Sequence, residues 1–300
     1  MRWRRRPAPV SEAGPGPAPA EGSSPATGPA DETARREATR GCVVRLEDVH
    51  VRLGERDVLR GVDLELRERR IGVVGANGSG KSTLARLLDG LVLPTAGRVL
   101  VDGLDTRRHG ARVRRRVGFV FTDPDAQIVM PTVAEDVAYS LRGTPPGPER
   151  DARVRAALAA RGLADHADHP AHLLSGGQKQ LLALASVLVT DPALVVADEP
   201  TTLLDRANTR RVAAELAALP QQLVLVSHDL DVVEQVAERV LVVDGGRVVA
   251  DDEPRAALAY YRRLVDEAPD GPGEPVTAPE TAPLPALGPT APARAPGAAR

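Results

Sequence analysis

Gly75 to Ser82 reads G-A-N-G-S-G-K-S, and this run decides the fold. It matches the phosphate-binding pattern G-x-x-x-x-G-K-[ST] at every fixed position. The apolar run Ile71–Val74 before it predicts a strand, and Thr83–Leu88 after it predicts a helix. Glycines let successive backbone N–H groups curl around a phosphate, and the helix N-terminus adds a partial positive charge. The stretch therefore predicts a nucleotide-binding protein rather than a chance glycine-rich turn.

Two side chains of this loop are expected to do more than shape it. Lys81 would reach the β- and γ-phosphates, and the Ser82 hydroxyl would ligate Mg²⁺. The predicted phosphate-contacting set comprises Gly75, Ala76, Asn77, Gly78, Ser79, Gly80, Lys81, Ser82 and Thr83.

The distribution of proline separates the two ends of the chain from its middle. Seven of the 27 prolines fall in residues 1–40 and nine in 268–300. Both ends are also poor in branched aliphatic residues, so they cannot bury enough apolar surface to offset the entropy of ordering. We therefore expect disordered tails over residues 1–42 and 268–300. The folded domain is expected over residues 43–267, which is long enough for a sizeable core.

Composition argues against several functional classes. The net charge of −2 gives no global field that would draw the protein onto nucleic acid. A single cysteine excludes an internal disulfide and fits a reducing compartment. The longest apolar stretch, Leu181–Val189, is too short to span a membrane. The basic start, Met1–Pro7, lacks the apolar segment of a secretion signal, which leaves a solvated tail or a membrane-surface contact.

Alternating strands and helices predict an α/β fold with a largely parallel sheet. Val43–Leu66 contains short alternating runs split by Gly54 and Gly61, which favours an antiparallel ribbon. From Pro124 to His172 the pattern becomes helical and reads as an insertion in the α/β core. Further strands are predicted at 97–103, 118–121, 193–197, 223–226 and 240–243, and helices from 175 and at 205–219, 229–237 and 252–265.

A second motif is the aliphatic run that ends in Asp198 and Glu199. A parallel strand delivers such carboxylates to the C-terminal edge of the sheet, beside a bound ligand. Asp198 would hold Mg²⁺ through water, and Glu199 would orient or deprotonate the attacking water. Taken alone, the run could also be a strand end with solvated acids.

Two further motifs are weaker when each stands alone. In L-S-G-G-Q-K, Leu174–Lys179, Ser175 can cap a helix whose glycines leave the N-terminus open to an anion. An ordinary helix start is the alternative. His228 follows a predicted strand at the same sheet edge, where it could touch the γ-phosphate.

In this order the motifs resemble the ATP-binding cassette of transporters, over residues 43–260. The resemblance implies the ABC ATPase fold: a RecA-like phosphate-loop NTPase core, an antiparallel β subdomain and a helical subdomain at about 124–190. It also implies ATP and Mg²⁺ as cofactors, with Lys81, Glu199 and His228 as catalytic residues. In the head-to-tail dimer of this family, each ATP lies between the phosphate loop of one subunit and the signature of the other. On the second subunit the implied contacts are Ser175, Gly176, Gly177, Gln178 and Asp205.

Val117–Ala138 is similar to the corresponding region of energy-coupling factor transporter ATPases, which energise import of vitamins and metal ions. Together with the flanking motifs it looks most like the biotin branch, although cobalt and nickel relatives share most of these residues. The implied partners are itself or a paralogous ATPase, a membrane T-component and a substrate-binding S-component, with no nucleic acid. The implied location is peripheral, on the cytoplasmic face of the cell membrane, with T-component docking around Gln127–Asp136.

The chain departs from this family's pattern at two positions. Thr122 stands where a glutamine usually reaches Mg²⁺ and water, so Thr122 or the nearby Gln127 is the expected further metal contact. Leu53 stands near the position of the aromatic residue that usually stacks on adenine. Neither change touches the phosphate loop or the acidic pair, so hydrolysis is expected to survive.

Two other classes use phosphate loops. Cassette ATPases that act on DNA or ribosomes place coiled coils or zinc modules before the signature, or carry two cassettes. Here Ser175 lies only 94 positions after Lys81, with no cysteine pair between them. A phosphate-loop kinase would leave the Leu174–Lys179 and Asp198–Asp205 runs without a role.

Overall fold

The structure is a computed structural model that describes residues 42–267. The predicted tails lie outside the described residues, except that Cys42, at the end of the first, is buried. Of the described residues, 42–261 belong to one compact unit, whereas the end of helix α9 (Pro254–Asp266) belongs to a second unit.

The predicted antiparallel ribbon is part of a four-stranded sheet in the order β2-β1-β4-β5. Gly54 lies in the turn between β1 and β2, as expected. Gly61, predicted as a break, instead lies inside β2 with a φ of +62°, where the pairing with β1 is irregular. It therefore acts as a bulge in a continuous strand. The strands are β1 (Val44–Leu53), β2 (Arg56–Leu66), β4 (Ala96–Val101) and β5 (Leu104–Asp105).

A six-stranded sheet with the order β10-β9-β3-β8-β7-β6 carries the predicted buried strands. Five neighbouring strands are parallel, and β10 pairs antiparallel at the edge. The sequence analysis missed β10, and Asp252, predicted to begin a helix, instead ends this strand. The strands are β3 (Arg70–Val74), β6 (Val117–Val120), β7 (Leu194–Asp198), β8 (Gln222–Val226), β9 (Arg239–Asp244) and β10 (Arg247–Asp252).

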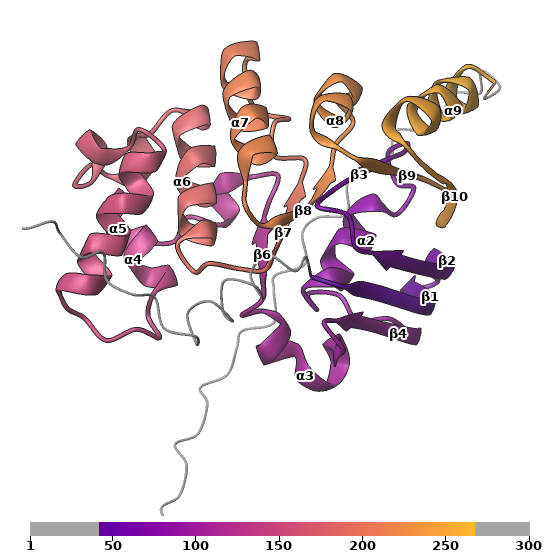
Figure 1. The fold of residues 1–300 in the computed structure, drawn as a ribbon, viewed down its shortest axis with the longest axis horizontal. Coiled ribbons are helices and arrows are strands. Elements are labelled where there is room, and N and C mark those ends of the chain that lie inside the picture. The colour runs from indigo at the N-terminus through magenta and orange to yellow at the C-terminus, as the bar shows by residue number, and fades with distance from the viewer. Residues whose placement is uncertain (1–41, 268–300) are drawn as a thin grey trace, which may run out of the picture. The chain divides into compact units, whose positions relative to one another are not determined.

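Both faces of this parallel sheet are covered, which explains its nearly continuous aliphatic strands. In β7, Leu194 and Val196 belong to the core shared with α2 (Lys81–Leu88) and the four-stranded sheet. Val195 and Ala197 point to the opposite core, under the other helices. In Figure 1, α7 (Arg206–Ala218) and α8 (Leu230–Val236) lie on one side of the parallel strands, and α2 with β1, β2 and β4 lies on the other.

The helical subdomain, expected at about 124–190, contains three helices that pack on one another, α4, α5 and α6. The sequence analysis missed α3 (Thr106–Val113), in which only Thr106 and Val113 are buried. The remaining helices are α4 (Val133–Ser140), α5 (Pro148–Ala160), α6 (Gly176–Leu188), α7 (Arg206–Ala218) and α8 (Leu230–Val236), with short 3-10 turns at 124–126, 164–166 and 171–173.

A buried arginine fixes the strand that leads into the phosphate loop. The Arg70 guanidinium donates hydrogen bonds to the carbonyls of Ala217 at 3.1 Å, Gln221 at 2.8 Å and Leu219. Carbonyls at a helix C-terminus lack intrahelical partners, and a guanidinium has enough donors to satisfy several of them. Arg70 therefore joins the start of β3, at the end of the strand opposite the phosphate loop, to the end of α7.

Candidate nucleotide site

The predicted site residues converge because four neighbouring parallel strands end at one edge of the sheet. The phosphate loop follows β3, His228 follows β8, the acidic pair ends β7, and Thr122 follows β6. Asp198 lies in register with Val226, the last residue of β8. Such a carboxyl edge is where ligands bind in open α/β sheets.

The glycines of the phosphate loop are required by its close packing. A Cβ on Gly75 would lie 2.1 Å from the Val243 carbonyl oxygen. Gly80, the N-cap of α2, has a φ of +112°, and a Cβ there would lie 3.0 Å from the Val58 carbonyl oxygen. Residues with a side chain rarely adopt such a φ, and moving the backbone atoms that a Cβ would strike costs free energy. The loop thus keeps its backbone close to β2 and β9.

Lys81 is buried at the start of α2, with its ammonium inside the loop. Its Nζ donates to the carbonyls of Gly75 at 2.8 Å and Ala76 at 2.9 Å. Burial lowers the pKa of Lys81, and the negative charges of Glu199 and Asp198 oppose that shift. A buried ammonium facing acidic groups is suited to an anionic ligand, because such a ligand adds compensating charge.

Asp198 is 1% exposed and lies against the phosphate loop. The Ser82 hydroxyl donates to its Oδ1 at 3.0 Å, and Arg86 Nη2 lies 4.0 Å from its Oδ2. Burial raises the pKa of Asp198, while the Ser82 hydrogen bond and the Arg86 charge act against it. A serine hydroxyl and a carboxylate are both hard oxygen donors, the kind that Mg²⁺ takes. The residues present therefore fit that ion.

Glu199 combines a strained backbone with a strong side-chain contact. Its φ is +52°, in the left-handed region that side chains rarely occupy. Its N–H donates to the Val226 carbonyl at 2.9 Å, which holds that conformation. Its Oε2 lies 2.7 Å from His228 Nδ1 and accepts from the Thr202 hydroxyl at 3.1 Å. The sequence analysis missed Thr202, because nothing in its pattern marks a hydroxyl beside that carboxylate.

The hairpin between β1 and β2 forms a wall of the cleft that contains the phosphate loop. Leu53, Arg56 and Val58 line the cleft opposite residues 77–83, and Leu53 is 53% exposed. Leu53 thus occupies the expected position beside the loop, with an aliphatic side chain. Arg56 Nη2 donates to the Gly78 carbonyl at 3.0 Å. Sequence reasoning missed Arg56, because only the cross-strand pairing with Leu53 brings it to this cleft.

The two expected alternatives for a further metal contact occupy different surroundings. The Thr122 hydroxyl donates to the backbone carbonyl of Asp198 at 2.9 Å. Gln127 Oε1 accepts from the Phe121 N–H at 3.2 Å, and its Nε2 donates to the Ala183 carbonyl at 3.1 Å. Gln127 therefore joins the end of β6 to α6, whereas Thr122 lies next to the acidic strand end.

The signature residues form the N-terminus of α6. Ser175 Oγ accepts from the Gln178 N–H at 3.3 Å, and Gln178 Oε1 accepts from the Ser175 N–H at 2.9 Å. This reciprocal pair is a capping box. A Cβ on Gly177 would lie 2.5 Å from Asn208 Cγ of α7, whose first turn is capped by Asp205. The hollow lined by Gly176 contains Lys179 and Leu203 but no residue of the phosphate loop.

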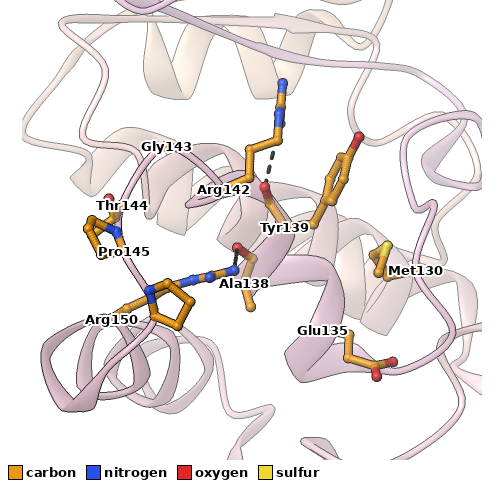
Figure 2. Close-up of a pocket in the computed structure, with 10 residues that line it drawn as sticks. Met130, Glu135, Ala138, Tyr139, Arg142, Gly143, Thr144, Pro145 and Arg150 are labelled. Carbon is orange, nitrogen blue, oxygen red and sulfur yellow. Dashed lines mark hydrogen bonds between the residues drawn. The ribbon is translucent and has the colours of Figure 1, made fainter.

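A separate hollow of about 500 Å³ lies on the helical insertion. Figure 2 shows Met130, Glu135 and Tyr139 on one side of it, and Thr144, Pro145 and Arg150 on the other. The Arg142 guanidinium lies 4.8 Å from the centre of the Tyr139 ring, and Arg150 donates to the Ala138 carbonyl at 2.5 Å. None of the predicted nucleotide-site residues lines this hollow.

Within residues 42–267, no helix is both long and apolar enough to cross a membrane.

Four features together define an ATP-binding cassette ATPase: the covered parallel sheet, the antiparallel sheet, the helical insertion and the loops at the sheet edge. The predicted fold class is therefore confirmed.

Comparison with known proteins identifies the family. The protein-family model described as ABC transporter matches residues 59–202 of this chain. A putative ABC transporter ATP-binding protein of Deinococcus radiodurans is 55% identical over 73% of this chain and 97% of that protein. The biotin transport ATP-binding protein BioM of Rhizobium etli is 43% identical over 74% of this chain and 98% of its own. The nickel import ATP-binding protein NikO of Rhodobacter capsulatus is 43% identical over 74% of this chain and 92% of its own.

This chain belongs to the ABC transporter ATP-binding proteins, and it is an ATPase coupled to transport. Two solved structures share its fold. One is cbiO1 from Clostridium perfringens, part of the ABC transporter complex cbiONQ, with a TM-score of 0.67, 29% identity and coverage of 76% of this chain and 96% of that chain. The other is a dimeric ATP-binding cassette in a post-hydrolysis state with ADP and Pi. It has a TM-score of 0.62 and 30% identity, and the match covers 71% of this chain and 99% of that chain.

Proposed function

We propose that this chain is the ATP-hydrolysing, energising subunit of an energy-coupling factor importer, and that its cargo is biotin. The observation that carries the ATPase part is the convergence of Lys81, the Ser82–Asp198 pair and the Glu199–His228 pair at one sheet edge. The 43% identity to BioM supports the cargo. A nickel or cobalt importer is the alternative, because NikO is equally similar.

The proposed site uses the phosphate loop and the acidic strand end together. Backbone N–H groups at the start of α2 and the Lys81 ammonium bind the β- and γ-phosphates of ATP. Ser82 and Asp198 would hold Mg²⁺, with Thr122 as the further contact, because both ends of the Gln127 amide already bond backbone groups. When bound, Mg²⁺ neutralises phosphate charge as the terminal phosphate departs.

Glu199 is the proposed general base for water. Its carboxylate keeps one oxygen on His228 Nδ1, at 2.7 Å, and on the Thr202 hydroxyl. These contacts orient the side chain before the reaction, so less ordering remains to be done in the transition state. His228, whose side chain is 58% exposed, is free to contact the γ-phosphate through its other ring nitrogen.

The signature completes the site only from a second copy, in the proposed head-to-tail dimer. Gly176 and the capping-box residues lie at the tip of α6, and Gly176 lines a hollow that contains no residue of the phosphate loop. The dimeric cassette bound to ADP and Pi, which has the same fold, supports this arrangement. The partner is a second copy of this chain or a paralogous ATPase, and Asp205 at the start of α7 links the two sites.

The cargo would pass through other polypeptides, which we propose are a membrane T-component and a substrate-binding S-component. This chain would lie peripherally on the cytoplasmic face of the cell membrane, with the T-component docked around Gln127–Asp136. Within that segment Val129 is 63% exposed, and Met130 lines the hollow of Figure 2. Asp136 is buried and accepts from the N–H groups of both, so it shapes the surface without being part of it.

A charge-removing substitution tests the ATPase step. With Glu199→Gln, we expect ATP hydrolysis to fall at least about a hundredfold, because the base is lost. ATP binding should persist, so the variant should accumulate as an ATP-bound dimer in light scattering. Near-normal turnover would show that Glu199 is not the base. Purification of the tagged protein from membranes, followed by uptake of labelled biotin and nickel, then tests the partners and the cargo.

A further inference from the structure

Helix α3 and the residues after it form a strongly basic stretch. Residues 106–116 contain six arginines and no acidic residue, although the whole chain has a net charge of −2. The six are Arg107, Arg108, Arg112, Arg114, Arg115 and Arg116, and all of them are exposed. We propose that this stretch, together with the loop after α2, binds the anionic lipid headgroups of a membrane surface.

Two of these arginines face carboxylates of the protein itself. Arg116 Nε donates to Asp102 Oδ2 at 2.9 Å, and the charge of Arg114 acts on the buried carboxyl of Asp89. A third acid, Asp105, accepts from two N–H groups at the start of α3. These contacts offset part of the positive charge, so an external anion would chiefly meet the remaining arginines.

Three arginines of the stretch are available to such an anion. The guanidinium groups of Arg108, Arg112 and Arg115 form no ion pair and no hydrogen bond within residues 42–267. In α3 only Thr106 and Val113 are buried, so the core holds the helix through those two residues and leaves the arginines in solvent. A guanidinium binds a phosphate group through two parallel N–H donors, and clusters of basic residues are attracted to anionic bilayers.

The loop after α2 adds an apolar component to the same surface. Leu91 is 43% exposed and Leu93 is 41% exposed. The Arg107 guanidinium donates to the Pro94 carbonyl, which joins α3 to this loop. Proteins that bind at a membrane interface combine cations, which contact headgroups, with apolar side chains, which enter the boundary of the acyl chains. The two leucines beside the arginines fit that combination.

A lipid surface fits this stretch better than nucleic acid, the other polyanion that binds arginine clusters. Residues 86–116 contain no phenylalanine, tyrosine or tryptophan on which a base could stack. Exposed leucines gain nothing from a phosphate backbone, whereas they gain free energy when they enter a bilayer interface. The inference rests on the proposed peripheral location, and it adds the bilayer itself as a binding partner beside the T-component.

Vesicle binding by the full-length protein tests the inference. The probes are vesicles of phosphatidylcholine alone and vesicles that also contain phosphatidylglycerol, an anionic lipid. At about 0.1 M salt we expect the protein to sediment with the anionic vesicles only, and to be released at about 1 M salt, where the Debye length falls to about 3 Å. Equal binding to both kinds of vesicle, or binding to neither, would overturn the inference.

A triple substitution assigns the binding to α3. In the Arg108→Gln, Arg112→Gln, Arg115→Gln variant, we expect the affinity for anionic vesicles to fall at least about tenfold, because each arginine near a charged bilayer adds to the attraction. Unchanged affinity would overturn the inference.

The matched control separates this surface from the overall charge of the protein. It replaces three exposed arginines elsewhere, Arg155→Gln, Arg210→Gln and Arg247→Gln, and therefore has the same net charge as the α3 variant. The control should bind anionic vesicles like the wild type. The basic start of the chain is present in every protein compared, so it cannot produce a difference between them. Equal affinities of the two triple variants would contradict a role for α3.

A second pair of measurements tests the choice of lipid. Leu91→Ser with Leu93→Ser should weaken binding to anionic vesicles about threefold or more, because less apolar surface enters the bilayer. Leu173→Ser, at a leucine that is 72% exposed on the helical subdomain, should leave binding unchanged. An excess of duplex DNA should not release the protein from the vesicles. Release by DNA, together with no effect of the two leucine substitutions, would show that the surface binds nucleic acid instead.

These measurements are independent of ATP hydrolysis. None of the three substituted α3 arginines lines the clefts beside the phosphate loop, so this variant should hydrolyse ATP within about twofold of the wild-type rate, which also shows that it folds. Normal hydrolysis in Glu199→Gln would count against the proposed ATPase mechanism and leave vesicle binding untouched. Absence of vesicle binding would overturn the lipid surface and leave the ATPase mechanism untouched.

Discussion

Asp198 and Glu199 are consecutive residues with different surroundings, and this difference separates their proposed roles. Asp198 is 1% exposed, its pKa is raised by burial, and Ser82 donates to it. The Glu199 side chain is 15% exposed and shares one oxygen with His228 and Thr202. The backbone differs as well, because Glu199 has a φ of +52° in the left-handed region.

The strained backbone at Glu199 should be measurable as stability. A non-glycine residue at such a φ costs roughly 1 kcal/mol, which glycine avoids. We therefore expect Glu199→Gly to unfold at an unchanged or higher urea concentration, while ATP hydrolysis falls at least about a hundredfold with the loss of the base. Chemical denaturation and steady-state ATPase assays measure the two effects.

Asp191 provides the matched control, because it has the same φ of +52° outside the nucleotide site. Asp191→Gly should change stability in the same direction and leave hydrolysis unchanged. A clear loss of stability in Glu199→Gly, without one in Asp191→Gly, would show that the Glu199 side-chain contacts outweigh the backbone strain.

Helix α2 ends at a buried carboxylate that should make stability depend on pH. Asp89 is 4% exposed and accepts the Leu91 N–H at 2.8 Å. Burial raises its pKa to about 6, and the Leu91 hydrogen bond and Arg114 oppose the shift. Its position at a helix C-terminus adds to the cost of a negative charge. The folded protein therefore binds a proton here more tightly than the unfolded chain does.

The sign of the effect follows from that difference. The stabilisation is fully present below the unfolded pKa of about 4, and it is lost as pH rises through about 6. The free energy of unfolding should fall by at most about 3 kcal/mol across this window from this residue. Asp89→Asn should remove that component in urea titrations from pH 4.5 to 7.5. Asp105→Asn, which alters a more exposed cap of α3, should keep it, and identical profiles for all three proteins would contradict the assignment.

The loop before α4 is the element proposed to meet the T-component. Met130→Glu would place a charge at the hollow of Figure 2 without touching the nucleotide site. We expect uptake in whole cells to fall at least about tenfold while basal ATPase stays within twofold, because a buried unpaired charge weakens an interface by kilocalories. Ala156→Glu, which adds the same single negative charge at an exposed position of α5, is the control. Unchanged uptake would place the docking surface elsewhere.

The secondary-structure elements differed in how well the sequence predicted them. The parallel strands were predictable because both of their faces are buried, which leaves continuous aliphatic runs. Helix α3 was missed because T-R-R-H-G-A-R-V has almost no apolar face and a glycine in the middle. Strand β10 was missed because its side chains are half-buried or exposed, although the glycine pair before it is a hairpin signal.

At the scale of the whole molecule, the proposed active site belongs to two chains, and a mixing experiment tests this. Lys81→Ala lacks a working phosphate loop, and Ser175→Arg lacks a working signature. Each homodimer should be inactive, but a mixed dimer contains one site with both halves intact. A 1:1 mixture should recover about a quarter of wild-type hydrolysis, since half of the dimers are mixed and each holds one of two sites.

A mixture that stays at the level of its inactive components would contradict the shared site. A Lys81→Ala, Ser175→Arg double variant mixed with either single variant serves as the control, because none of the resulting dimers contains an intact site.

The site residues that strand order places were predicted from the sequence, whereas those that depend on the packing of loops and side chains were not. Motifs at the ends of parallel strands must share one sheet edge, so the Ser82–Asp198 and Glu199–His228 contacts follow from strand order. Arg56 and Thr202 come from a hairpin and a loop. Their side-chain contacts depend on how those segments pack, which a linear pattern does not encode.

The hydrogen bonds that the phosphate loop accepts from Lys81 affect the rate of nucleotide binding. Lys81 is already tethered by the Gly75 and Ala76 carbonyls, so an arriving anion meets a side chain whose rotamers are settled. Freezing a free lysine costs up to about 2 kcal/mol of entropy, and here folding has absorbed that cost in advance. Nucleotide binding then requires Lys81 to exchange its carbonyl acceptors for phosphate oxygens, which is a local change that needs no search among side-chain rotamers.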